Sequence, residues 1–237
     1  MYNGRPGSKY NQFIHAVGGG NLKKVAAILD TGFEIDTSSP RTDGFSALHF
    51  ASQEGDEPMV SLLIKRGAAL DLRTGSSLTA LHLASNFGKT KIVKRLLAAG
   101  AQPDLREPRV GATALMMASH AGRSEVVELL VSAGASANQV GEKQWDGKTA
   151  LILALEAGHI ETADALAPHS AFEQAQIEHV MAFLQRHRAR NAVLDSPVEE
   201  AKAEAPAPRD TEPDVEVASR SRPGQLELAA QLMSVSF

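Results

Sequence analysis

One stretch of sequence occurs four times at nearly constant spacing, and this internal repeat limits the fold more than any other feature. Its register is marked by four equivalent leucines, Leu48, Leu81, Leu115 and Leu151, which are 33, 34 and 36 residues apart. A glycine follows each leucine after seven residues, at Gly55, Gly88, Gly122 and Gly158. A unit of this length cannot bury its apolar surface alone, so the repeat predicts a solenoid in which each unit packs against its neighbours.

The central repeat, residues 76–106, shows the local structure that each unit is expected to form. Thr79 can cap a first helix, and Gly88 can end it in a backbone conformation that other residues adopt only with strain. A second helix carries large apolar residues at helical spacing and ends at Gly100. These residues are Ile92, Val93, Leu96 and Leu97. Each unit is therefore predicted to be a pair of helices joined by a tight turn.

The same repeat carries a family motif. Thr79, Ala80, Leu81 and His82 stand where ankyrin repeats have T-P-L-H, and other signature positions hold Ala84, Gly88, Gly100, Ala101 and Asp104. Over residues 10–168 the chain resembles the ankyrin repeat family, with about five repeats. The resemblance implies an all-α fold, an ankyrin-repeat solenoid of stacked helix-turn-helix units with β-hairpin fingers.

The expected domain organisation follows from the repeat register and from the composition. Residues 1–9 precede the repeats, which we place at 10–40, 41–74, 75–107, 108–144 and 145–168. The amphipathic segment 169–190 is expected to be a C-terminal capping helix that covers the last repeat. After it the sequence becomes rich in Pro, Ala, Glu and Asp, which predicts a disordered tail over residues 191–237. Within this tail, residues 225–237 regain apolar side chains and are a candidate short binding motif.

Composition argues against several classes of protein. The 237 residues carry a net charge of −4, without the concentrated basic surface that nucleic acids or anionic membranes usually require. With no cysteine, the sequence offers no disulfide, no thiolate zinc site and no cysteine nucleophile. No apolar run approaches the roughly 20 residues that cross a bilayer, and the N-terminal residues lack the apolar core of a secretory signal. We therefore expect a soluble monomer of the cytoplasm, with the nucleus as a second compartment.

No catalytic, metal or cofactor site is predicted. His49 and His82 occupy the family's structural histidine position, which implies a bond to the backbone of the neighbouring finger. Residues 88–90, Gly-Lys-Thr, imitate the end of a phosphate-binding loop, but Leu83 stands where that motif requires its first glycine. Without a nucleophile, an acid-base pair or a metal set, the sequence indicates a protein that is not an enzyme.

The resemblance implies a partner-binding face instead. Ankyrin repeats bind other proteins through their fingers and first helices, which together line a concave surface, and the fold alone does not choose the partner. The family's contact positions in this chain are Thr42, Asp43, Phe45, Gln53, Glu54, Ser76, Leu78, Asn86, Phe87, Arg109, Val110, His120, Trp145, Asp146, Lys148 and Glu156. The apolar members Phe45, Leu78, Phe87 and Trp145 would form an exposed strip that anchors a protein. Longer fingers or a folded-back tail could instead cover part of this strip.

We prefer a non-enzymatic adaptor, scaffold or regulator that binds a protein partner on the concave face, and two alternatives remain open. The first is a regulator that associates with nucleic acid through basic residues near the fingers. These residues are Arg41, Arg73, Arg106 and Arg109. Acidic residues lie among them, so a nucleic-acid partner is less expected. The second alternative is a tail-mediated adaptor, in which the C-terminal peptide 225–237 is the ligand of another protein.

Overall fold

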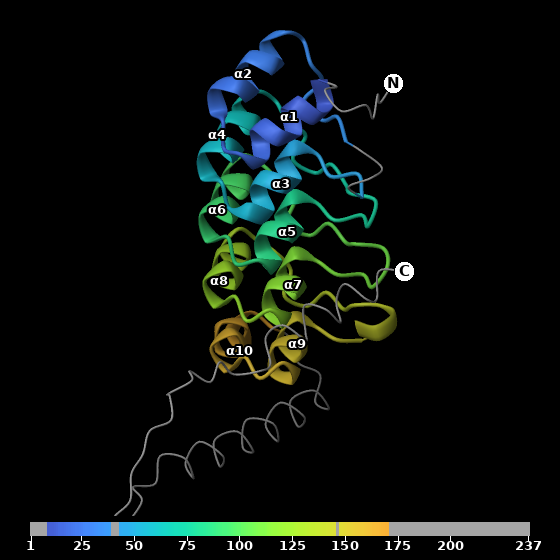
Figure 1. The fold of residues 1–237 in the computed structure, drawn as a ribbon. Helices are drawn as coiled ribbons and strands as arrows, with labels where there is room; N and C mark the ends of the chain where they lie inside the picture. The colour runs from blue at the N-terminus through green and yellow to red at the C-terminus, as the bar shows by residue number, and fades with distance from the viewer. Residues whose placement is uncertain (1–8, 39–42, 146, 171–237) are drawn as a thin grey trace, which may run out of the picture. The chain divides into compact units, whose positions relative to one another are not determined.

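The repeats stack so that their helices form two columns (Figure 1). The computed structural model describes residues 9–38, 43–145 and 147–170. The inner column consists of α1 (Lys9–Gly18), α3 (Ala47–Glu54), α5 (Ala80–Asn86), α7 (Ala114–His120) and α9 (Ala150–Glu156). The outer column consists of α2 (Leu22–Asp30), α4 (Glu57–Lys65), α6 (Thr90–Ala98), α8 (Ser124–Ser132) and α10 (Ile160–Leu166). Each helix contacts its equivalent in the next repeat, so the predicted all-α repeat solenoid is confirmed.

Helix α5 begins at the cap that the sequence predicts and ends just before Gly88. At the start of α5, the backbone N–H of His82 donates to Thr79 Oγ1 (3.4 Å), and the N–H of Thr79 donates to His82 Nδ1 (3.2 Å). This reciprocal capping satisfies backbone donors that a helix leaves unpaired. Beyond the other end, Gly88 has a φ of +65°, in the left-handed region that favours glycine. A Cβ there would also meet the Arg123 side chain, so Gly88 lets the next repeat approach closely.

One apolar core runs through the described stack. The four register leucines, Leu48, Leu81, Leu115 and Leu151, are at most 2% exposed. The outer column contributes fully buried side chains to the same cluster, among them Ile92 and Leu96 of α6. Removal of this apolar area from water is the main force that holds the repeats together. The leucines that mark the repeat register in the sequence therefore all lie in the core.

The fingers differ from the β-hairpins that the resemblance implies. Within the described residues no strand forms, and three successive fingers are each closed by one backbone hydrogen bond. The N–H of Thr74 donates to Leu78 O (2.9 Å), that of Glu107 to Ala112 O (2.8 Å) and that of Gly141 to Lys148 O (2.9 Å). The first two bonds enclose three and four residues, and in the described residues no further ladder pair forms beside them; the third finger contains a short 3-10 helix, η2 (Lys143–Trp145). These fingers are therefore turns rather than hairpins.

Bonds that recur from repeat to repeat hold neighbouring loops together. In each case the carboxylate of an aspartate accepts a backbone N–H from the following repeat. The pairs are Asp36 with Ala69 (3.1 Å), Asp71 with Gln102 (3.1 Å) and Asp104 with Ser136 (2.9 Å). The loops thus find in their neighbours the backbone partners that they lack internally.

Several predictions concern residues outside the described part of the chain. They include the N-terminal residues 1–8, the capping segment beyond Ser170, and the tail 191–237 with its motif 225–237. The same applies to the single residues Arg41, Thr42 and Asp146. The last described element, the 3-10 helix η3 (Ala167–His169), follows α10 directly. Among the described helices, none has the length and apolar character needed to cross a membrane.

Candidate functional site

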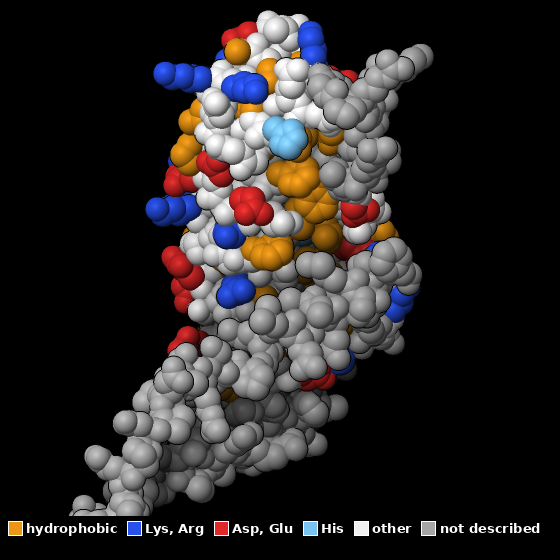
Figure 2. Space-filling view, viewed as in Figure 1, with side chains coloured by type: hydrophobic (Ala, Val, Ile, Leu, Met, Phe, Trp, Pro, Cys, Tyr) orange, Lys and Arg blue, Asp and Glu red, His pale blue; other side chains and the backbone are white. Residues whose placement is uncertain are grey.

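The fingers and the inner helices form one face of the stack, which we call the finger face. Figure 2 shows hydrophobic side chains gathered on this face over α3 and α5. Of the predicted contact residues, fourteen lie in the described part of the chain, and none of these is buried. They are therefore accessible, as the side chains of a binding surface must be.

The apolar part of the finger face is centred on two phenylalanines, one of which sequence reasoning missed. The ring of Phe45 lies 5.1 Å from that of Phe50 and 5.6 Å from that of His49, measured between ring centroids. Phe50 follows His49 on α3 and is half-buried. A signal was present, because Phe50 is a large apolar residue at the one variable position within the T-P-L-H-x-A motif.

The predicted apolar strip is exposed unevenly. Phe87, which follows the last residue of α5, is 46% exposed. Phe45 and Leu78 are half-buried, and Trp145 is half-buried against the core. The expectation of four exposed anchors is therefore fully met only by Phe87, because the finger residues pack down onto the inner helices.

A pocket of about 340 Å³ opens at the end of α7 and α9. It is lined by His120, Trp145, Lys148, Leu153, Glu156 and Ala157. The rings of His120 and Trp145 lie 5.5 Å apart at an angle of 55°. Lys148 Nζ donates to Glu156 Oε2 at 2.8 Å, and both side chains remain partly exposed. The structure thus brings four of the predicted contact residues together around one hollow.

The protonation state of His120 in this pocket is set by partial burial of its imidazole and by the charged groups around it. Burial lowers the pKa of the His120 imidazole below 6.5, and His159 and Lys148 lower it further, whereas Glu156 raises it. His120 is therefore neutral near pH 7, and its ring serves as an aromatic wall. Among the described residues, the ionised groups that line the pocket are then Lys148 and Glu156, which pair with each other.

The two motif histidines are structural, as predicted. The Nε2 atom of His82 lies 3.3 Å from Ala112 O, and that of His49 lies 2.9 Å from Leu72 O. Because Nδ1 of His82 accepts the N–H of Thr79, Nε2 carries the proton and donates across the loop. Burial lowers the pKa of His82 to about 4 and also lowers that of His49. Both imidazoles are therefore neutral and fully used by the fold.

Some predicted contact residues also hold the fingers in shape. The carboxylate of Asp43 accepts the N–H of Ser76 at 3.0 Å, which links two neighbouring fingers. The carboxylate of Glu107 accepts the N–H groups of Arg109 (2.6 Å) and Val110 (2.9 Å). These bonds fix the backbone around the side chains that face outward, so the finger face is preorganised rather than loose.

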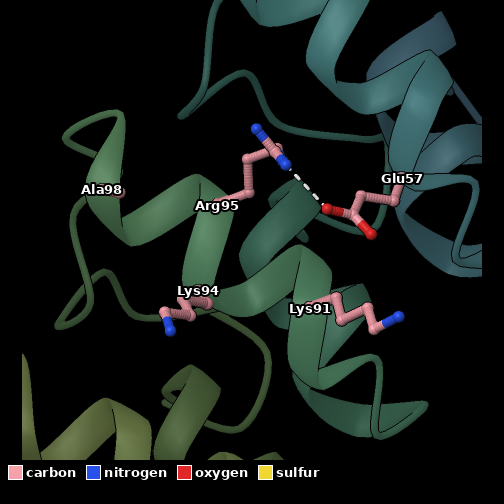
Figure 3. A pocket seen from close by; sticks show the side chains of 5 residues that line it. All are labelled: Glu57, Lys91, Lys94, Arg95 and Ala98. Atoms are coloured by element: carbon pink, nitrogen blue, oxygen red, sulfur yellow. Dashed lines mark hydrogen bonds and ion pairs between the residues drawn. The ribbon is translucent and has the colours of Figure 1, made fainter.

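A second hollow, of about 510 Å³, lies on the outer column between α4 and α6 and is lined by Glu57, Lys91, Lys94, Arg95 and Ala98 (Figure 3). Arg95 Nη2 pairs with Glu57 Oε1 at 2.6 Å, and this bond lowers the pKa of the Glu57 carboxyl. Lys91 and Lys94 point away from each other and from that pair. The cations therefore do not converge on a common point, as an anion site would require. In the described residues no group of His, Cys, Asp and Glu is placed to hold a metal.

Comparison with known families agrees with this architecture. The family model of ankyrin repeats (3 copies) matches residues 13–107 and 81–178. Together these matches cover more than half of the chain and coincide with the stack, so the chain belongs to the ankyrin repeat family. A search of curated proteins found no match to the chain. Ankyrin repeats generally mediate protein–protein interactions and are typically non-enzymatic, so the class of protein is a protein-binding repeat domain.

Proposed function

We propose that this chain is a non-enzymatic adaptor, scaffold or regulator that holds a protein partner on its finger face. The observation that carries the proposal is the exposed ring of Phe87, which shares this face with the Phe45 and Phe50 pair and with the Trp145 pocket. Aromatic side chains that are preorganised and accessible are the usual anchors of protein interfaces. The outer column offers no comparable aromatic cluster within the described residues.

The nucleic-acid alternative is less favoured by the geometry. Arg73 and Arg106 both donate to backbone carbonyl oxygens of the following fingers, so their guanidinium groups serve the stack. Among the described arginines near the fingers, this leaves Arg109, which is exposed, and one cation is a small electrostatic footprint for a phosphate backbone. The alternative that uses the C-terminal peptide concerns residues 225–237, which lie outside the described part of the chain.

The proposal is tested by affinity capture with matched surface variants. The full chain, Phe87→Ala and Leu22→Ala are each immobilised and exposed to the same cell extract. Leu22 on the outer α2 is also a large exposed apolar residue, at 36%, so it controls for non-specific hydrophobic capture. A protein that is retained by the wild type and Leu22→Ala but lost by Phe87→Ala supports the proposal. A protein that Phe87→Ala and Leu22→Ala both retain as well as the wild type does would place the binding surface elsewhere.

A further inference from the structure

The pocket at the ends of α7 and α9 already holds a cation, the Lys148 ammonium, beside aromatic rings. This arrangement indicates which kind of side chain a partner would insert there. The Lys148 ammonium sits on Glu156 at the edge of the pocket, whose walls include Trp145 and His120. A volume of about 340 Å³ is at the small end of ligand pockets, so it suits one long side chain rather than a cofactor.

The Lys148–Glu156 pair is easily displaced. The side chain of Lys148 is 34% exposed and that of Glu156 is 44% exposed, so the attraction between them is screened by water. Exposed pairs of this kind contribute little to stability. Glu156 is the more accessible member of the pair. Its carboxylate can therefore exchange Lys148 for an incoming cation at a small cost in free energy.

The local charges favour a cation over an anion. An anionic group would meet the Glu156 carboxylate and would have Lys148 as its one cationic neighbour among the described residues of the pocket wall. A cation gains from Glu156 and from the face of an indole, which attracts positive charge. The helices α7 and α9 both end at this pocket, and the C-terminal end of a helix carries partial negative charge.

Among cations, the guanidinium group fits best. It is planar, stacks on aromatic rings and binds a carboxylate through two parallel N–H donors, whereas an ammonium offers a single point charge. We propose that the pocket formed by His120, Trp145, Lys148 and Glu156 takes an arginine side chain of the protein partner, which stacks on Trp145 and replaces Lys148 on Glu156. This inference rests on the proposed function, because it names the chemistry by which the same face recognises its partner.

The single tryptophan of the chain gives this pocket its own reporter. The full chain, labelled with 15N, is titrated with acetyl-Gly-Arg-Gly-amide while the indole N–H resonance of Trp145 is followed. We expect a saturable shift with a dissociation constant in the millimolar range that weakens as salt is added. The citrulline peptide, which has the same shape without the charge, should leave the resonance in place. The lysine peptide should bind at least about threefold more weakly.

Three variants test the residues that carry the proposal. Glu156→Gln should weaken binding of the arginine peptide about tenfold, because it removes the charged acceptor. Lys148→Met keeps the aliphatic stem but removes the competing ammonium, and should strengthen binding roughly threefold. Glu161→Gln, at an exposed carboxylate on α10, should change nothing. A thermal melt of each variant checks that the stack remains folded.

The proposal is overturned if the arginine peptide leaves the resonance unmoved, if citrulline moves it equally, or if Glu156→Gln binds as well as the wild type. Tighter binding of acetyl-Gly-Glu-Gly-amide would likewise overturn it and would make the pocket an anion site. These results are separable from the proposed function. Partner capture that still depends on Phe87 would leave the finger face as the binding surface even if arginine fails. Arginine binding without any captured partner would leave the pocket chemistry intact and remove the adaptor role.

Discussion

Arg73 donates a hydrogen bond from Nη1 to the backbone carbonyl oxygen of Arg106 at 2.9 Å, and these two arginines are equivalent residues of consecutive repeats. Arg106 makes the same kind of bond to the carbonyl oxygen of Val140 in the next finger at 2.7 Å. Its guanidinium also pairs with Glu142 at 3.2 Å. Each arginine thus joins its own finger to the following one, which explains how fingers without strands keep their shape.

The first prediction concerns this arginine ladder. Arg106→Gln should lower the free energy of unfolding by about 1 kcal/mol, because it removes charge-assisted bonds that are partly screened by water. In the described residues the Arg109 side chain has no bonded partner, so Arg109→Gln should change stability by less than about 0.5 kcal/mol. Urea denaturation of both variants decides the matter. Equal stability of the two would show that the ladder contributes nothing.

The second prediction concerns the response of the stack to acid. The pKa of His82 is about 4 in the folded chain, whereas an unfolded histidine titrates near 6.5. Between these values the unfolded state binds the proton and the folded state does not, so stability falls as the pH falls through this window. Stability should therefore decrease by up to roughly 1.4 kcal/mol per pH unit as the pH falls from 6.5 towards about 4, and the full stability should be present above pH 6.5. Burial lowers the pKa of His49 too, which adds to the slope.

A natural replacement supplies the control for this pH effect. Met116 occupies the motif position in the following repeat, so His82→Met copies a residue that the stack already accepts. The variant should be less stable at pH 7, because the buried Thr79 N–H loses its acceptor and Ala112 O keeps only its bond from the Glu107 N–H. Its melting temperature should nevertheless vary less between pH 5 and 6.5. An unchanged pH slope would mean that His82 is not buried in its neutral form.

The third prediction separates core packing from the surface. Leu96 of α6 is fully buried, so Leu96→Ala should cost about 2 to 5 kcal/mol. Phe87→Ala should stay within about 1 kcal/mol, because the ring of Phe87 is 46% exposed. Chemical denaturation measures both. A loss below about 0.5 kcal/mol for Leu96→Ala would contradict the assigned repeat register.

Much of the fold was predictable because it depends on local spacing. The register leucines, the glycine after each first helix, the capping role of Thr79 and the bond of His82 to the next finger follow from residue type at fixed offsets. The shape of the fingers was not predictable in the same way. Their turns are held by bonds to the next repeat, as between Asp43 and Ser76, and such bonds depend on how the units stack.

The candidate site was predictable in its members but not in their arrangement. The family's contact positions identified His120, Trp145, Lys148 and Glu156 individually. Their convergence depends on the long finger that carries Trp145 in η2, and no spacing rule fixes the path of such a loop. The half-burial of Phe45 was missed for a related reason, because it depends on contact with Phe50, which was not among the predicted contact residues.

The most direct test of the account compares the affinity of a captured partner for three forms of the full chain by isothermal titration calorimetry. Phe87→Ala should weaken binding by about 2 kcal/mol, or roughly 30-fold, as truncation of an aromatic anchor does. Leu22→Ala should bind within about twofold of the wild type, because Leu22 lies on the outer column. Wild-type affinity in Phe87→Ala together with weakened binding in Leu22→Ala would contradict the claim that the finger face is the binding surface.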